Sequence, residues 1–267
     1  MARILHITDT HLPGEEIRGL HDVPVWEFFD QLLELVGAMP EKPDLLLHTG
    51  DLAEDGAVDA YERFRKRVSA IGLPFLVLNG NHDTPEELAS RLDMPSTSHA
   101  DKAFSIDFIH EVDGFPIVAL DTWHPEQRNP LGRVTDGQLD WLARVLDRLA
   151  SPALVCMHHA PFPLGSPWLD ENMVTSGGDA LHAVLRNRAD RVRAVLHGHL
   201  HRGVRVVRDG VAYHGLAALG WQYTWLPWTP SPEVDANAAA VWQLIELSSD
   251  RVQLMEYSLP RLPDHKS

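Results

Sequence analysis

Residues that could bind metal ions follow apolar runs of strand length at five places in the sequence. The clearest is Gly80-Asn81-His82-Asp83, which comes directly after Phe75-Leu76-Val77-Leu78. A strand that ends in a turn of functional groups holds reactive side chains rigidly on a loop. The same arrangement recurs at Asp9-Thr10-His11, Gly50-Asp51, His158-His159 and Gly198-His199-Leu200-His201.

The candidate ligands in these motifs are imidazoles, carboxylates and one amide: Asp9, His11, Asp51, Asn81, His158, His199 and His201. This mixture suits borderline ions such as zinc, manganese and iron, and argues against calcium or a thiolate cluster. Seven ligands suffice for two ions if one carboxylate bridges them. Two ions about 3.5–4 Å apart clamp the attacking and leaving oxygens of a phosphoryl displacement and supply hydroxide near neutral pH.

His82 adjoins a candidate ligand, but we expect it to stay uncoordinated and to protonate the leaving alkoxide as a general acid. A carboxylate would hold its tautomer. The candidates for that carboxylate are Glu54, Asp55 and Asp83.

Each motif taken alone arises often by chance, so the metal prediction depends on all five occurring together. Four further histidines near strand ends have a simpler interpretation as core residues or as hydrogen-bond partners of ligands. They are His6, His48, His159 and His197.

The first part of the chain alternates predicted strands with amphipathic helices, which indicates βαβ units and a parallel sheet buried on both faces. The strands are residues 3–8, 45–47 and 75–78, and the helices are 25–36 and 59–71. Later, 104–108 and 115–120 predict an antiparallel pair and 136–149 a helix. Two hairpins are expected at 204–214, through Asp209-Gly210, and at 241–257.

Composition limits the function classes. The 267 residues carry a formal net charge of −15, which opposes stable binding to duplex nucleic acid. The single cysteine, Cys156, lies in an apolar run, so it predicts a buried residue and excludes an internal disulfide. No signal-peptide pattern and no membrane-spanning stretch are present in the sequence, so a cytoplasmic location is expected.

Residues 221–232 form a loop in which aromatic residues alternate with prolines. It is too hydrophobic to extend freely into water, so we expect it to cover the active-site mouth or a partner subunit. Trp225 and Trp228 are the candidate substrate contacts, because a nucleobase stacks on aromatic rings. The sequence favours packing or an interface as the role of this loop, and base stacking is the alternative.

The five motifs, in this order, resemble those of the calcineurin-like metallophosphoesterases, from residue 4 to about residue 201. Asp121-Thr122 and His158-His159-Ala160-Pro161 are similar to bacterial class III cyclic-nucleotide phosphodiesterases and their glycerophosphodiesterase relatives.

The resemblance implies a four-layer α/β/β/α sandwich of two mixed sheets flanked by helices, as one domain over residues 1–267, with all ligands at one edge. It assigns Asp9, His11 and His201 to the first ion. It assigns Asn81, His158 and His199 to the second ion, with Asp51 bridging and His82 assisting the leaving group. The family often has Asp three residues after the bridging one, where this chain has Glu54, so Glu54 and Asp55 both remain candidates.

The expected activity is hydrolysis of small phosphodiesters, such as cyclic nucleotides or glycerophosphodiesters, by a hydroxide that bridges two ions of manganese, iron or zinc. A phosphomonoesterase, a nucleotide pyrophosphatase or a nuclease is the alternative on the same centre. A metal-free scaffold that binds a protein is the alternative from another class. Homo-oligomerisation is left open.

Overall fold

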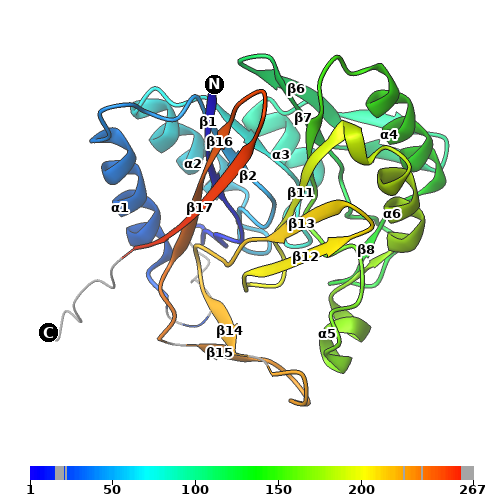
Figure 1. Cartoon of the computed structure of the whole chain (residues 1–267). Helices are drawn as coiled ribbons and strands as arrows, with labels where there is room; N and C mark the ends of the chain where they lie inside the picture. The colour runs from blue at the N-terminus through cyan, green and yellow to red at the C-terminus, as the bar shows by residue number, and fades with distance from the viewer. Residues whose placement is uncertain (16–20, 22, 225, 236, 260–267) are drawn as a thin grey trace, which may run out of the picture.

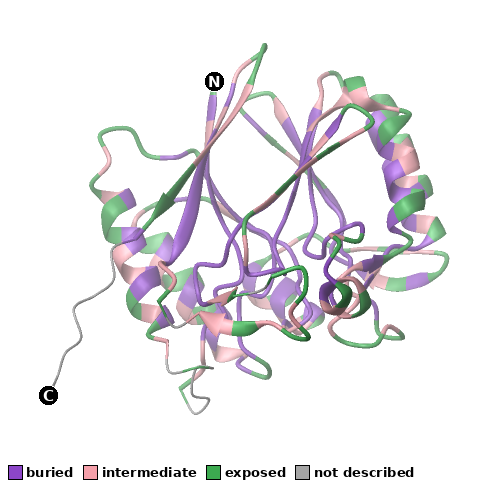
Figure 2. Cartoon of the chain, turned by 60° about the horizontal axis from the view of Figure 1, so that its bottom comes forward, coloured by how far each residue is buried: buried purple, intermediate pink, exposed green. Residues whose placement is uncertain are grey.

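Two mixed β-sheets lie face to face in the middle of the molecule, and helices cover both outer surfaces (Figure 1). The computed structural model describes residues 1–15, 21, 23–224, 226–235 and 237–259. Figure 2 shows buried strands in the centre and exposed residues on the outer helices and loops. This four-layer sandwich confirms the fold class that the sequence predicts.

The first sheet has five strands in the order β17-β16-β1-β2-β3. Strands β1, β2 and β3 are parallel, β16 is antiparallel to β1, and β17 is antiparallel to β16. Its strands are β1 (Ala2–Ile7), β2 (Leu45–His48), β3 (Phe75–Val77), β16 (Val241–Leu247) and β17 (Val252–Ser258). The helices that share its core are α1 (Val25–Gly37), α2 (Asp59–Ala70) and α3 (Pro85–Leu92).

The second sheet has six strands in the order β12-β13-β11-β9-β7-β6, with four parallel strands in the middle and an antiparallel strand at each edge. Its strands are β6 (Phe108–Val112), β7 (Phe115–Ala119), β9 (Ala153–Cys156), β11 (Val192–His197), β12 (Val204–Arg208) and β13 (Val211–Gly215). The helices on its outer face are α4 (Asp136–Arg148) and α6 (Gly178–Arg186).

Alternation along β7 shows how the layers pack. Ile117 and Ala119 belong to the core shared with the first sheet, whereas Val118 and Leu120 pack with the residues of α4 and α6. Successive side chains of a strand point to opposite faces, so an unbroken apolar run places one set between the sheets and the other under the helices. The single cysteine, Cys156, is buried in this core, as predicted.

The predicted strand over residues 104–108 is wrong in its bounds. The structure has β5 (Lys102–Ser105), paired with β4 (Thr97–His99), and then β6, with a break at Ile106 and Asp107. Side chains replace strand partners there: Ile106 N donates to Asp121 Oδ2 (3.2 Å), and Asp107 Oδ1 accepts from Asp121 N (2.6 Å). The antiparallel partner of β7 is therefore β6.

The structure also has shorter elements, and most of them lack a sequence signal of their own. They are β8 (Gly132–Arg133), α5 (Pro167–Asn172), β10 (Thr175–Ser176), the 3₁₀ helix Ala189–Arg191, β14 (Gln222–Thr224) and β15 (Glu233–Asp235). Both predicted late hairpins are confirmed, as β12–β13 and β16–β17. Across the described ranges, no helix has the length and hydrophobicity needed to cross a bilayer.

Candidate metal centre

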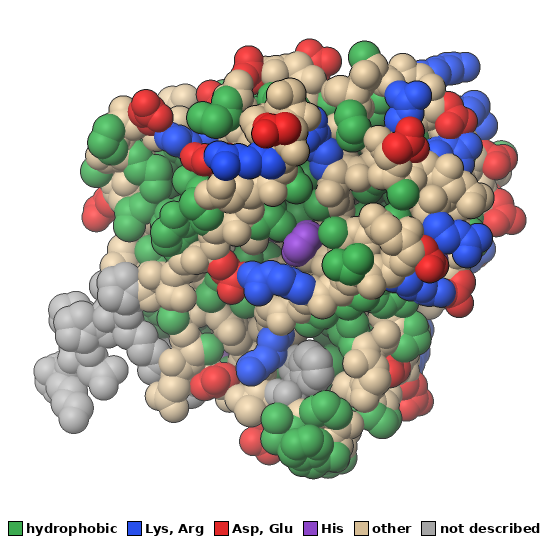
Figure 3. Space-filling model, in the orientation of Figure 1, with side chains coloured by type: hydrophobic (Ala, Val, Ile, Leu, Met, Phe, Trp, Pro, Cys, Tyr) green, Lys and Arg blue, Asp and Glu red, His purple; other side chains and the backbone are tan. Residues whose placement is uncertain are grey.

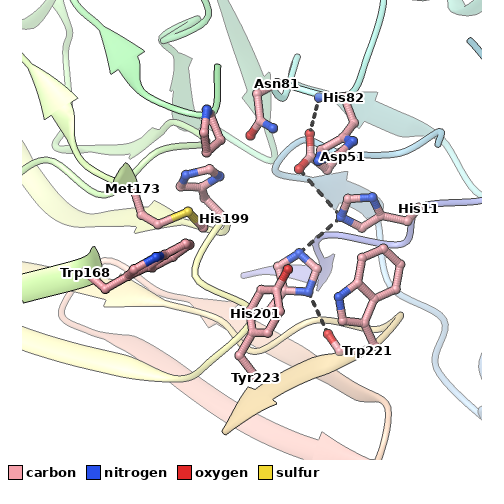
Figure 4. Close-up of a pocket in the computed structure, with 11 residues that line it drawn as sticks. His11, Asp51, Asn81, His82, Trp168, Met173, His199, His201, Trp221 and Tyr223 are labelled. Atoms are coloured by element: carbon pink, nitrogen blue, oxygen red, sulfur yellow. Dashed lines mark hydrogen bonds and ion pairs between the residues drawn. The ribbon is translucent and has the colours of Figure 1, made fainter. Parts of the chain in front are cut away.

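All seven predicted ligands lie just beyond the carboxyl ends of parallel strands. Asp9 and His11 follow β1, Asp51 follows β2 and Asn81 follows β3. His158 follows β9, and the last two ligands follow β11. The loops after neighbouring parallel strands meet at one edge of a sheet, and the edges of the two sheets lie together. Five of the seven candidate ligands line one pocket there (Figure 4): His11, Asp51, Asn81, His199 and His201.

The backbone at this edge is unusual. Five of the seven candidate ligands have positive φ: Asp9 (51°), His11 (45°), Asp51 (54°), His199 (71°) and His201 (49°). A non-glycine residue in this region costs about 1–3 kcal/mol, and such residues cluster at functional sites. Two glycines in the motifs also leave necessary space, because a Cβ on Gly80 would collide with Asp51 and one on Gly198 with Thr8.

The first group of ligands joins Asp9, His11, Asp51 and His201. The Nε2 atoms of His11 and His201 are 3.1 Å apart, and Nε2 of His11 is 3.6 Å from Asp51 Oδ2. Nε2 of His201 is 3.6 Å from Asp9 Oδ1. Because Nδ1 of His201 donates to the Trp221 carbonyl (2.7 Å), its Nε2 presents a lone pair. Lone pairs that converge in a buried pocket fit a cation between them.

The second group is arranged around His158. Its Nε2 lies 3.2 Å from Asp51 Oδ2 and 3.2 Å from Asn81 Oδ1, while its Nδ1 donates to the Thr49 carbonyl (2.8 Å). Nε2 of His199 is buried and has no hydrogen-bond partner in the described part of the chain. These donors also fit a cation, and Asp51 contacts members of both groups, as a bridging carboxylate must.

Burial and the Asp51 carboxylate shift the pKa values of several groups in the pocket. Burial disfavours a charged His158, but the Asp51 carboxylate outweighs burial and raises the pKa of His158 to about 9. Burial raises the pKa of Asp9 to about 6. Burial likewise lowers the pKa of His201 to about 4. The two aspartates therefore create a local demand for positive charge that a metal ion can meet.

Asn129, which the sequence reading did not single out, holds Asn81 in place. Nδ2 of Asn81 donates to Oδ1 of Asn129 (3.2 Å), and Nδ2 of Asn129 donates to the Asn81 carbonyl (3.3 Å). It follows no strand end, so no pattern in the sequence marks it.

His82 lies beside the ligands with two carboxylates at its Nδ1. Asp55 Oδ1 is 2.9 Å away and Glu54 Oε1 is 3.5 Å away. Burial opposes a charged His82, but Asp51 and these two carboxylates raise its pKa to about 10. Despite burial, His11 and His82 lower the pKa of Glu54 to about 2.

Glu54 contacts a ligand as well as His82. Its Oε2 is 3.4 Å from Nδ1 of His11, and its side chain is buried. Asp83 has a different place from the one expected. Its carboxylate accepts the backbone N–H groups of Leu52 (3.2 Å), Ala53 (3.1 Å) and Gly80 (3.0 Å), so it ties the two ligand loops together instead of facing His82.

The four remaining strand-end histidines are buried. Three bond to neighbouring groups: His6 to Gln243 and Thr49, His48 to Thr10, and His197 to the Gly198 carbonyl. His159 differs. Its Nδ1 bonds to Thr122 Oγ1 (2.7 Å), and its ring nitrogens lie close enough to those of His158 and His199 to form a third candidate group.

A pocket opens above the ligands. Trp221 and Tyr223, from the aromatic segment, line it, so that segment does border the site. Trp228 does not line the pocket and is 77% exposed, and Trp225 lies outside the described residues. Trp168 and Met173, which the sequence reading did not select, form another part of the wall.

The comparisons with known proteins agree with this geometry. The model of the calcineurin-like phosphoesterase family matches residues 2–203. A probable cyclic nucleotide phosphodiesterase from Synechococcus sp. is 32% identical over 251 residues, which cover 92% of this chain and 88% of that protein. The 3',5'-cyclic adenosine monophosphate phosphodiesterase CpdA of Escherichia coli is 31% identical over 252 residues, which cover 93% and 86%.

A solved structure, a dimetal phosphatase from Danio rerio, has a TM-score of 0.66 at 16% identity and covers 96% of this chain and 99% of that one, which shows the shared fold. The chain belongs to the calcineurin-like phosphoesterase family. The resemblance seen in the motifs is confirmed. So is the expected class of enzyme, a metal-dependent phosphodiesterase.

Proposed function

We propose that the chain hydrolyses 3',5'-cyclic nucleotides at a centre of two metal ions. The observation that carries this proposal is the place of Asp51, whose Oδ2 lies 3.6 Å from Nε2 of His11 and 3.2 Å from Nε2 of His158. One carboxylate between two sets of buried donors is the arrangement that a bimetallic phosphoesterase needs. The names of the two bacterial relatives support a cyclic nucleotide as the diester.

Asp9, His11 and His201 would hold one ion and Asn81, His158 and His199 the other, with Asp51 shared. The donor types suit manganese, iron or zinc. Such a pair, when bound, supplies hydroxide near neutral pH and neutralises charge on the phosphoryl oxygens. The chain's own contribution is orientation: Trp221 and Thr49 carbonyls fix the imidazoles of His201 and His158.

His82 would donate a proton to the departing alkoxide. Asp55 and Glu54 engage its Nδ1, so its Nε2 is the nitrogen left for the substrate. The Glu54 and Asp55 carboxylates favour the protonated form of this imidazole. A group of this kind contributes about 10²–10⁴-fold to such reactions.

The net charge of −15 supports a small diester rather than duplex nucleic acid as the substrate. We also propose the cytoplasm as its compartment, because a single buried cysteine is typical of reducing conditions.

A rate panel at fixed manganese content tests the substrate proposal. It compares 3',5'-cyclic AMP, a glycerophosphodiester, bis(p-nitrophenyl) phosphate, p-nitrophenyl phosphate and a nucleotide pyrophosphate. The proposal predicts the highest kcat/KM on the cyclic nucleotide and a slower reaction on the monoester. A monoester or a nucleotide pyrophosphate that reacts faster than every diester would assign the centre to the alternative class, and inertness toward all of them would favour a scaffold.

A further inference from the structure

Two of the pocket's aromatic side chains already pack against the metal-ligand histidines. The ring of Trp221 lies 4.2 Å from that of His11 and 5.0 Å from that of His201, measured between centroids. The ring of Tyr223 lies 5.0 Å from that of His201. These contacts hold the imidazoles in place and occupy the ring faces, so the two residues act as a support for the ligands.

Trp168 is different. It lines the same pocket beside Met173, on the side opposite Trp221 in Figure 4. Its side chain is half-buried, and within the described ranges its ring makes no contact with another aromatic ring. An indole face and a thioether beside a polar centre form an apolar surface that a flat ligand can cover.

The segment that carries Trp168 is firmly attached near the ligands. Leu169 and Met173 pack in a small core with Leu200, the residue between His199 and His201. This packing fixes the distance between the indole and the metal ligands.

Hydrogen bonds fasten both ends of the same segment. The Asp170 carboxylate accepts from the backbone N–H groups of Leu164 (2.6 Å) and Gly165 (3.0 Å). The Arg128 guanidinium donates to the Glu171 carbonyl (3.2 Å) and to Asn172 Oδ1 (3.3 Å). A preformed surface of this kind binds a ligand without the cost of ordering a loop.

We propose that Trp168, together with Met173, binds the nucleobase of the cyclic nucleotide while the phosphodiester lies at the metal centre. This inference rests on the proposed function and adds a specificity-determining residue to it. Stacking on an indole is available to every base, so adenine and guanine nucleotides should both bind there. Trp228 has no part in it, because it does not line the pocket.

Steady-state kinetics of the manganese-loaded enzyme on two substrates test this inference: 3',5'-cyclic AMP and the ribose 3',5'-cyclic phosphate that lacks a base. The variants are Trp168→Ala, Trp168→Phe and, as the matched control, Trp228→Ala. We expect Trp168→Ala to lower kcat/KM about 10-fold on cyclic AMP, mainly through KM, and to leave the abasic substrate unchanged. Trp168→Phe should restore most of the loss, and Trp228→Ala should change neither substrate.

The outcomes separate this inference from the proposal beneath it. If Trp168→Ala slows both substrates equally, or neither, Trp168 does not bind the base. If the wild-type enzyme hydrolyses the abasic phosphate as well as cyclic AMP, the base-binding role is also wrong, while the phosphodiesterase proposal stands. If the wild-type enzyme cleaves aryl diesters but neither cyclic phosphate, the proposed substrate class itself fails and the base-binding role fails with it.

Discussion

Asn81 and Asn129 form a reciprocal pair that fixes which atom of Asn81 faces the metal ligands. Nδ2 of Asn129 donates to the main-chain carbonyl of Asn81, so Oδ1 of Asn129 faces the side-chain amide of Asn81. Nδ2 of Asn81 donates to that oxygen, and Oδ1 of Asn81 therefore points at His158. A backbone carbonyl, which can only accept, thus determines the orientation of two side-chain amides.

Replacement of Asn129 should therefore weaken the second metal site selectively. We expect Asn129→Ala to bind the second ion about 3- to 10-fold more weakly, since one hydrogen bond contributes about 0.5–1.5 kcal/mol. Asn129→Asp keeps the oxygen that accepts from Asn81 but loses the donor to the Asn81 carbonyl, so it should weaken the second site as well. Calorimetric titration of metal-stripped protein with Mn²⁺ measures both ions, and unchanged second-ion affinity in Asn129→Ala would contradict the positioning role.

His82→Ala tests the general acid. The variant should still bind two ions, because the proposed ligand set does not include His82. Loss of its proton should slow diesters with alkoxide leaving groups about 10²-fold or more, and p-nitrophenolate esters much less, because a good leaving group needs no proton. The measurement is kcat over a series of leaving groups. Equal slowing across the series would remove the assigned role.

Glu54 and Asp55 can be distinguished by burial. Glu54 is buried and contacts both His11 (3.4 Å) and His82 (3.5 Å), whereas the Asp55 side chain is 69% exposed. Solvent screens the exposed pair, so Asp55→Asn should change kcat by less than about 5-fold. Glu54→Gln should lower kcat about 10- to 100-fold, as loss of a group that orients a metal ligand does. The measurement is kcat of the two variants on one substrate. A larger loss of kcat in Asp55→Asn than in Glu54→Gln would identify Asp55 as the orienting residue.

The buried His6 should make the free energy of unfolding depend on pH. It is buried, its Nδ1 donates to Gln243 Oε1 (3.3 Å), and burial lowers its pKa to about 4. The unfolded chain, with a pKa near 6.5, takes up the proton first, so stability is full above pH 6.5 and falls as the pH drops toward 4. The difference corresponds to about 3 kcal/mol.

Denaturant unfolding of metal-free protein at pH 7.5 and pH 4.5 measures this effect, with His6→Gln as the comparison. The variant lacks the titrating group, so its free energy of unfolding should depend less on pH by about this amount. An identical pH dependence in both proteins would show that His6 is not the group responsible.

The convergence of the candidate ligands could be predicted from the sequence because each of them follows an apolar strand. Neighbouring parallel strands end at the same edge of a sheet, so the loops that carry Asp9, Asp51 and His158 meet there. The hairpin β12–β13 could also be predicted from the sequence, because Asp209-Gly210 marks a tight turn between two apolar runs.

The residues that form the rest of the pocket wall could not be predicted from the sequence. Trp168 and Asn129 lie in loops between elements, and their place depends on tertiary contacts such as those of Leu169 with Leu200. Composition drew attention to Trp228, which lies between β14 and β15, is 77% exposed and does not line the pocket. Figure 3 shows hydrophobic side chains gathered at the bottom of the molecule. The break at Ile106 also had no local signal, because its N–H is satisfied by a side chain fifteen residues away.

If Asp51 joins two metal ions into one catalytic unit, activity must depend on the second ion. The decisive measurement is cyclic AMP hydrolysis at each ratio as metal-stripped protein is titrated with Mn²⁺. We expect little activity up to one ion per chain, a rise to a plateau at two, and neither plateau nor second ion in Asp51→Asn. Full activity with one ion per chain, or an Asp51→Asn variant that behaves like the wild type, would contradict it.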